Sequence, residues 1–322
     1  MMRDRRAGTL ALEGVTRTFR VRARRSVRWD TVTAVDRMGF SVAAGESVGY
    51  IGANGAGKST TIKMSAGILV PTAGTVRTCG LDPIRERREL ARHIGVVFGQ
   101  RSQLWWDLPV SESLAILGDI HRMGGAAVRE RTRLLVDTLD MAGFWSTPVR
   151  QLSLGQRMRA EVAAALLHSP SLLILDEPTI GLDVLSKQQL RQFLIAERAR
   201  TGMTLLLTTH DMGDIERLCD RVLVVDRGHL AFDGTLSGLA DTVGARRILV
   251  VDLATPAADL TDVPGTWHLA SEAGGLRQRL AFDSAGTTVP TVLQSIATRA
   301  EVRDLSIEEP DIEDVVRRIY AK

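Results

Sequence analysis

The sequence has no apolar run near the roughly 18 to 20 residues that a bilayer-spanning helix requires. Any transport role would therefore need a separate membrane-spanning chain. The first residues lack the apolar region and cleavage site of a secretory signal peptide, so we expect no signal peptide. Two cysteines, Cys79 and Cys219, give neither a disulfide framework nor zinc-ligand spacing, which suits a reducing cytosol.

The sequence also lacks a strong excess of either charge. A net charge of +3 in 322 residues is too small to indicate nucleic-acid binding, and no nucleic-acid partner is expected. Arginine is nevertheless concentrated in the first 30 residues. This region is interpreted as a solvated arm, or else as a contact for anionic lipid head groups or an acidic partner. The length allows one large domain and a smaller one.

Apolar runs that alternate with helical patterns predict a parallel sheet with crossover helices. Strands are expected at 47–51, 94–98, 171–176, 203–209 and 222–226, with a short one ending at 232 and a helix at 58–69. Between residues 100 and 160 the pattern becomes helical, with helices at 111–122 and 127–141 and another beginning near Ser153. We therefore predict an α/β domain over residues 1–238 that contains a helical subdomain at about 100–160.

The character of the sequence changes again after residue 238. Strands are predicted at 246–253, 266–270, 276–282 and 302–307, and helices at 289–299 and 311–320. This order of elements suits a small α+β accessory domain over residues 239–322.

A complete G-x-x-x-x-G-K-[ST] pattern occupies residues 52–59, between a predicted strand and a predicted helix. Backbone amides of this loop and the positive end of the helix dipole suit binding of nucleotide phosphates. Lys58 would add a positive charge, and the Ser59 hydroxyl would ligate Mg²⁺. The predicted nucleotide-binding residues of the loop are Gly52, Asn54, Gly55, Ala56, Gly57, Lys58, Ser59 and Thr60. The fold class is therefore an α/β P-loop NTPase core with a mixed or parallel sheet.

An Asp-Glu pair follows the apolar run at 172–175, which predicts a strand buried on both faces. Asp176 would then emerge at the carboxyl end of the strand and hold Mg²⁺. Glu177 is the candidate to polarise the attacking water. Paired acids after a strand are by themselves equally typical of a helix cap, and the phosphate loop favours the catalytic interpretation.

The sequence Leu-Ser-Leu-Gly-Gln at residues 152–156 stands at a predicted helix N-terminus. The Ser153 hydroxyl, the close backbone at Gly155 and the helix dipole suit a γ-phosphate, although alone the pattern is no more than an N-cap. Together with the phosphate loop and the Asp-Glu pair, this stretch resembles the signature of ABC transporter nucleotide-binding subunits. Leu154 replaces the usual middle glycine of that signature.

The resemblance implies further site residues. Gln100 matches the residue that contacts Mg²⁺ and links to the membrane subunit, with Gln103 as a nearby rival. Asp183 matches the D-loop, and His210 matches the histidine that senses the γ-phosphate. Phe19 falls where an aromatic residue stacks on adenine, although a core position is the alternative.

In this family two ATP-binding domains associate head to tail, with ATP between one phosphate loop and the opposing signature, which here includes Ser153, Gly155 and Gln156. The chain therefore needs a second copy of itself or a paralogous subunit. The resemblance implies that ATP closes the dimer, that hydrolysis involving Lys58, Glu177 and His210 reopens it, and that a membrane permease follows the movement. The subunit is expected at the cytoplasmic face of the cell membrane.

Residues 96–109 resemble bacterial exporter ATPases related to antibiotic-resistance and polysaccharide-export subunits, as do the arginine-rich insertion at 20–28 and the ending at 309–316. That acidic ending is alternatively a solvated helix start. Trp105 and Trp106 either line the groove for the permease or pack inside the helical subdomain. The alternatives to an export ATPase are a non-transport ABC ATPase in translation or DNA repair, an ATP-binding regulator without turnover, and an importer ATPase.

Overall fold

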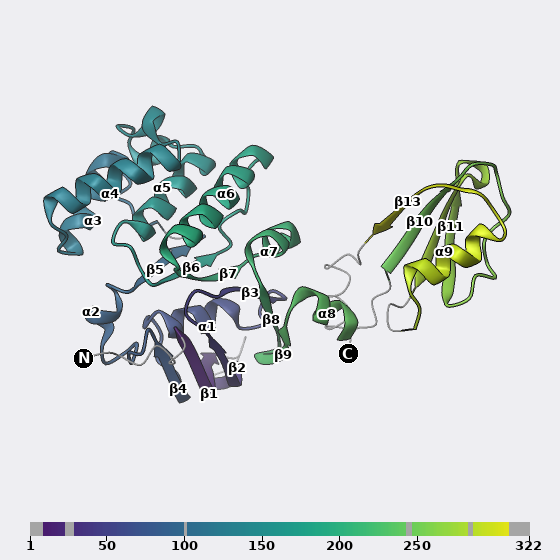
Figure 1. Ribbon diagram of the computed structural model, residues 1–322. Coiled ribbons are helices and arrows are strands. Elements are labelled where there is room, and N and C mark those ends of the chain that lie inside the picture. The colour runs from purple at the N-terminus through teal and green to yellow at the C-terminus, as the bar shows by residue number, and fades with distance from the viewer. Residues whose placement is uncertain (1–8, 23–28, 100–101, 243–246, 283–285, 309–322) are drawn as a thin grey trace. The chain divides into compact units, whose positions relative to one another are not determined.

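The computed structural model describes residues 9–22, 29–99, 102–242, 247–282 and 286–308 (Figure 1). The chain divides between Gly234 and Thr235 into two compact units. This division lies slightly before the domain boundary that the sequence suggests at residue 238. No helix within the described ranges is long and apolar enough to cross a membrane.

A six-stranded sheet lies at the centre of the first unit, with the strand order β5-β6-β7-β3-β8-β9. Its strands are β3 (Ser47–Gly52), β5 (Ile94–Phe98), β6 (Leu172–Asp176), β7 (Thr204–Thr208), β8 (Arg221–Asp226) and β9 (His229–Gly234). All neighbouring pairs are parallel except β8 and β9. Every residue of β3 and β7 is buried, which explains why these strands read as continuous apolar runs.

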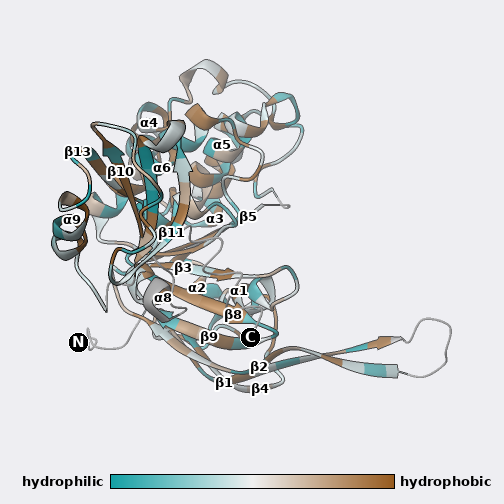
Figure 2. Cartoon of the chain, turned by 90° about the vertical axis from the view of Figure 1, so that its right-hand side faces the viewer, coloured by the Kyte–Doolittle hydropathy of each residue, from teal (hydrophilic) through white to brown (hydrophobic). Residues whose placement is uncertain are grey.

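A second, antiparallel sheet of the first unit has the order β2-β1-β4. Its strands are β1 (Leu10–Arg22), β2 (Trp29–Val42) and β4 (Ala73–Thr78). β1 pairs with β4 only as far as Thr16 but with β2 as far as Arg22, so β1 and β2 continue together beyond β4 (Figure 2). The sequence patterns predicted neither β2 nor β4.

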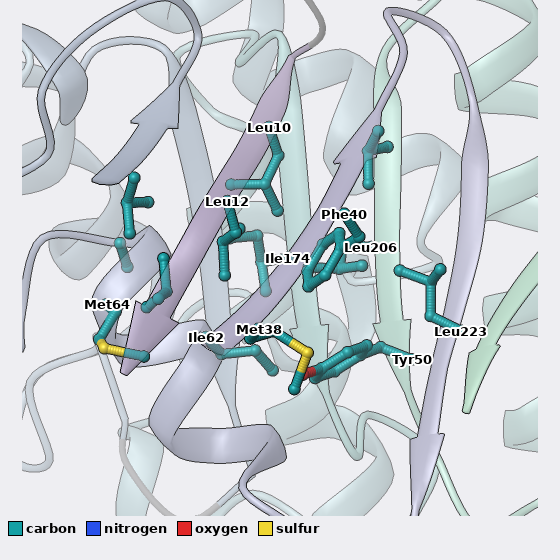
Figure 3. Packing of buried hydrophobic residues seen from close by; sticks show 14 of the residues in the cluster. Leu10, Leu12, Met38, Phe40, Tyr50, Ile62, Met64, Ile174, Leu206 and Leu223 are labelled. Atoms are coloured by element: carbon teal, nitrogen blue, oxygen red, sulfur yellow. The ribbon is translucent and has the colours of Figure 1, made fainter. Parts of the chain in front are cut away.

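One hydrophobic core cluster of the first unit joins these two sheets and α1 (Lys58–Ser65). Figure 3 shows the packing of Leu10, Leu12, Met38, Phe40, Tyr50, Ile62, Met64, Ile174, Leu206 and Leu223. The phosphate loop runs from Gly52 at the end of β3 to Lys58 at the start of α1, so this packing fixes both ends of the loop.

The other helices of the first unit are α2 (Arg87–Leu90), α3 (Val110–Ile120), α4 (Gly125–Thr138), α5 (Leu154–Leu166), α6 (Val184–Thr201) and α7 (Met212–Leu218), with short 3-10 turns at Ala142–Phe144 and Val149–Gln151. Helices α3 and α4 pack against α5, and α5 also packs against β5. The predicted helical subdomain is thus joined to the six-stranded sheet through α5.

The prediction that the helix after the phosphate loop reaches residue 69 is wrong, because α1 ends at Ser65. Gly67 has a φ of 70°, a left-handed conformation that favours glycine and ends a helix. The amides of Ile68 and Leu69 then both donate to the carbonyl of Lys63, at 2.8 and 3.0 Å.

The second unit contains α8 (Leu236–Thr242) and an antiparallel sheet of order β11-β12-β10-β13. The strands are β10 (Arg247–Leu253), β11 (Thr266–Glu272), β12 (Arg277–Phe282) and β13 (Val302–Glu308), with a 3-10 turn at Ala273–Gly275. Helix α9 (Val289–Ala297) contributes Val292 and Ile296 to a separate core with Leu249 and Phe282. The predicted helix at 311–320 lies outside the described residues.

Candidate nucleotide-binding and hydrolysis site

The phosphate-loop pattern forms the turn between β3 and α1. Gly52 ends the strand, Asn54, Gly55 and Ala56 belong to the turn, and Lys58, Ser59 and Thr60 open the helix. Gly57 has a φ of 101°, and a Cβ there would lie 2.4 Å from the carbonyl oxygen of Ala34. Glycine is therefore required at position 57 for both conformation and space.

Lys58 is almost fully buried and folds back over its own loop. Its Nζ donates to the carbonyl oxygens of Gly52 at 2.5 Å and Ala53 at 3.2 Å. Burial lowers the pKa of Lys58, while the nearby carboxylates of Glu177 and Asp176 oppose that shift. An anionic ligand in this loop would stabilise the charged form of the lysine in the same way as those carboxylates.

Asp176 lies at the carboxyl end of β6 and is held on one side by β7. The Thr208 hydroxyl donates to its Oδ1 at 2.6 Å, whereas its Oδ2 lies 3.5 Å from the Ser59 Oγ. Two oxygens from the phosphate loop and the sheet therefore converge. Such hard oxygen donors suit Mg²⁺, which usually binds one or two protein ligands together with substrate phosphates.

Glu177 follows directly and has an unusual backbone conformation. Its φ is 57°, a left-handed value that is uncommon for a residue other than glycine and frequent at functional sites. The ladder between β6 and β7 ends just before it, at Asp176 and Thr208, and the Glu177 amide donates to the Thr208 carbonyl at 2.9 Å. From this turn the Glu177 carboxylate reaches His210.

The Glu177 carboxylate contacts His210 with both oxygens. The His210 amide donates to Oε2 at 3.3 Å, and the His210 Nε2 lies 3.1 Å from Oε1. Oε1 is buried and has no hydrogen bond of good geometry, so it retains the capacity to accept one. Burial raises the pKa of Glu177, and Asp176 adds to this, while His210 and Lys58 oppose it. A carboxylate with a raised pKa and a free acceptor suits proton abstraction from water.

Ser153 and Gln156 form a capping box at the start of α5. The Gln156 amide donates to the Ser153 Oγ at 3.2 Å, and the Ser153 amide donates to the Gln156 Oε1 at 2.9 Å. Within the described part of the chain, these two residues bond to each other and not to the phosphate loop.

Asp183 caps α6 and lies next to the signature. It accepts from the amide of Ser186 at 2.9 Å and from its hydroxyl at 2.7 Å, and these bonds lower the pKa of Asp183. A Cβ at Gly155 would lie 2.9 Å from the Ser186 Oγ, and one at Gly181 would lie 2.7 Å from a Leu154 methyl carbon. The signature and the segment around Asp183 thus form one continuous surface.

Of the remaining predicted residues, Phe19 is described and Gln100 is not. Phe19 lies on β1 opposite Val32, is partly exposed, and has the Arg17 guanidinium 4.6 Å from its ring centroid. Gln100 lies outside the described residues. Its rival Gln103 donates to the Val96 carbonyl at 2.6 Å.

The two tryptophans after the Gln loop are exposed. Trp105 is 38% exposed and Trp106 is 53% exposed, so packing inside the helical subdomain does not account for them. Both side chains therefore remain accessible to a partner protein.

Thr208 was not predicted as a site residue, yet it bonds to Asp176 and to the backbone of Glu177. Nor were Thr179, Thr209 and Asp214, which are buried next to the predicted catalytic residues. The only available signal was closeness in sequence. Thr179 stands two residues after Glu177, and Thr209 and Asp214 stand on either side of His210, but no motif marks these three residues.

Comparison with known proteins agrees with this geometry. The family described as ABC transporter matches residues 35–180. The Nod factor export ATP-binding protein I of Paraburkholderia xenovorans is 37% identical over 72% of this chain and 79% of its own length. The daunorubicin/doxorubicin resistance ATP-binding protein of Streptomyces peucetius is 32% identical over 88% of this chain and 86% of its own.

Solved structures agree as well. An ATP-binding subunit of an ABC transporter aligns with a TM-score of 0.63 and 25% identity, over 74% of this chain and 94% of its own. A dimeric ATP-binding cassette with ADP and phosphate in a post-hydrolysis state aligns with a TM-score of 0.62 and 25% identity. The alignment covers 70% of this chain and 98% of that structure's chain.

The fold and the site define an α/β P-loop ATPase, which confirms the predicted fold class and enzyme class. The chain belongs to the ABC transporter family, and within it to the ATP-binding subunits of the exporter type.

Proposed function

We propose that this chain hydrolyses ATP to drive export through a separate membrane permease. The observation that carries the proposal is the contact of Glu177 with His210 beside Asp176 and Lys58, in a chain whose relatives are named for export of Nod factor and for resistance to daunorubicin. We assign the binding and hydrolysis of ATP to residues 1–238, and an accessory role to residues 239–322.

In this proposal the phosphate loop binds the phosphates of ATP, and Lys58 and the loop amides stabilise their charge. Ser59 and Asp176 would hold Mg²⁺, together with Gln100, and the ion would neutralise phosphate charge. The Glu177 carboxylate accepts the proton of the attacking water. His210 keeps the Glu177 carboxylate in place through its amide and ring. Phe19 stacks on the adenine.

We further propose a head-to-tail dimer with a second copy or a paralogous subunit. Ser153, Gly155 and Gln156 would face the phosphate loop of the partner, and Asp183 would lie at the interface. Two features support this: among the residues that the structure describes, Ser153 and Gln156 bond to each other and not to the phosphate loop of the same chain, and a related cassette is dimeric.

The permease would contact the subunit near Gln100, where Trp105 and Trp106 expose their rings. The subunit would then lie at the cytoplasmic face of the membrane. The test is affinity purification of the tagged full chain from detergent-solubilised membranes of its native host, followed by mass spectrometry. A multi-span permease should co-purify, and a Trp105→Ala/Trp106→Ala variant should recover less of it. Recovery of ribosomes or DNA in place of a permease would contradict the export function.

A further inference from the structure

Four segments of the first unit meet at one buried carboxylate, that of Asp214 on α7. The side chain of Asp214 has no exposed surface. Its Oδ2 accepts a hydrogen bond from the Thr179 hydroxyl and another from the Thr209 hydroxyl at 3.2 Å. Its Oδ1 accepts from the Arg191 Nε on α6 at 2.5 Å. Both threonines are also buried, so these hydrogen bonds form without competition from water.

The two threonines flank the proposed catalytic residues. Thr179 stands two residues after Glu177, and Thr209 directly precedes His210. The β6–β7 ladder ends at Asp176 and Thr208, so the ladder does not determine how the chain continues on either side. Beyond that point, Asp214 joins the two segments that carry Glu177 and His210.

The charge of Asp214 is balanced within the same cluster. Arg191 contacts both Asp214 and Asp211, the latter at 3.2 Å, and Lys187 contacts Asp211 at 2.6 Å. Two carboxylates thus face two cations. A buried carboxylate is tolerated because it is paired and fully hydrogen bonded.

We infer that Asp214 is a positioning residue for ATP hydrolysis, which holds Glu177 and His210 in their mutual contact through Thr179 and Thr209. The inference rests on the catalytic role proposed for Glu177. A carboxylate is the side chain that can accept from two hydroxyls and a guanidinium at once. An amide in its place removes the negative charge that faces Arg191, and its N–H group could bond to Thr179 and Thr209 only if their hydroxyls turned to accept, so the arrangement of the cluster would change.

The first test is Asp214→Asn in the full chain, with kcat for ATP hydrolysis and nucleotide affinity measured separately. Misplacement of a catalytic group by about 1 Å costs on the order of 100-fold in rate, so we expect kcat to fall by about 10- to 100-fold. ATP affinity should change by less than about twofold, because Asp214 makes no contact with the phosphate loop among the described residues. Glu216→Gln makes the same chemical change at an exposed site of α7 and should leave kcat unchanged.

A second comparison separates positioning from general loss of structure. In a Glu177→Gln background, Asp214→Asn should cause a much smaller loss in single-turnover hydrolysis than in the wild type, because one of the two groups that it positions is already absent. An equal loss in both backgrounds would overturn the inference. So would an Asp214→Asn variant with the kcat of the wild type, whereas normal turnover in Glu177→Gln alone would overturn the role of Glu177 itself.

Thr179 provides a test that does not require a substitution at Asp214. Thr179→Val keeps the shape of the side chain but removes the donor, and Thr179→Ser keeps the donor. We expect kcat to fall at least fivefold in the valine variant and to remain within about twofold of the wild type in the serine variant. If both variants retain full kcat, or if both lose it equally, the hydroxyl is not what positions Glu177.

Discussion

Arg131 on α4 and Glu197 on α6 form a buried ion pair that joins the helical subdomain to the helix after the Asp-Glu pair. Their side chains are 9% and 4% exposed. The Nε and Nη2 of Arg131 also donate to the Leu166 carbonyl at 3.2 and 3.1 Å. Replacement of Arg131 by methionine would leave that carbonyl and the Glu197 carboxylate with fewer partners in a dry environment.

The expected loss of folding stability depends on the hydrogen-bond donors that remain around Glu197. Removal of one partner of a buried ion pair destabilises a protein by about 3 to 5 kcal/mol. Arg200 still donates to Glu197 at 3.0 and 2.9 Å, which favours the lower end of that range. For a domain of this size, ~3 kcal/mol lowers the melting temperature by about 6 to 12 °C.

The assay is thermal unfolding of the full chain, followed by calorimetry so that the transition of the ATPase unit is resolved. Arg133→Met alters an exposed arginine on the same helix and should shift the transition by little, since surface changes cost within about 0.5 kcal/mol. Arg131→Met with Glu197→Leu should recover part of the loss, because no buried charge then lacks its partner. A shift below about 2 °C for Arg131→Met, or strict additivity in the double variant, would refute the reasoning.

Three further outcomes are expected. Gly155→Val should spare nucleotide binding by the monomer but prevent the ATP-dependent dimer in light scattering, because its Cβ would lie 2.9 Å from the Ser186 Oγ; a normal dimer would remove the signature from the interface. Phe19→Ala should weaken ATP affinity in a titration, and unchanged affinity would leave Phe19 as a packing residue. Because burial raises the pKa of Glu177 in the free protein, kcat/KM should fall as the pH is lowered through a value above the usual carboxyl pKa of about 4.3; a flat acid limb would contradict the proposed base.

The parallel strands were predictable from the sequence because each is a short run of apolar residues buried on both faces. The ends of β5 and β6 agree with the prediction within one residue. The strands β1 and β2 were harder, since part of their length is exposed and their register shifts between Leu12 and Thr18. Such irregularities interrupt the alternation of polar and apolar residues on which strand prediction depends.

The site residues that belong to recognisable sequence motifs could be predicted, whereas the contacts between those motifs could not. The positive φ of Glu177 and its contact with His210 depend on how two loops leave neighbouring strands, which no local pattern records. The role of Asp214 was equally hidden from the sequence, because its three hydrogen-bond partners come from three other segments. A lone aspartate on a short helix carries no signal until tertiary packing brings those segments together.

Glu177 is proposed to activate water in an ATP site that a second subunit completes. The most direct measurement is ATP hydrolysis and light scattering of Glu177→Gln in ATP and Mg²⁺. The variant should bind ATP as the wild type does, lose turnover by about 100- to 10,000-fold, as expected for loss of a general base, and accumulate as a dimer. Turnover near that of the wild type, or a monomer in saturating ATP, would contradict the account.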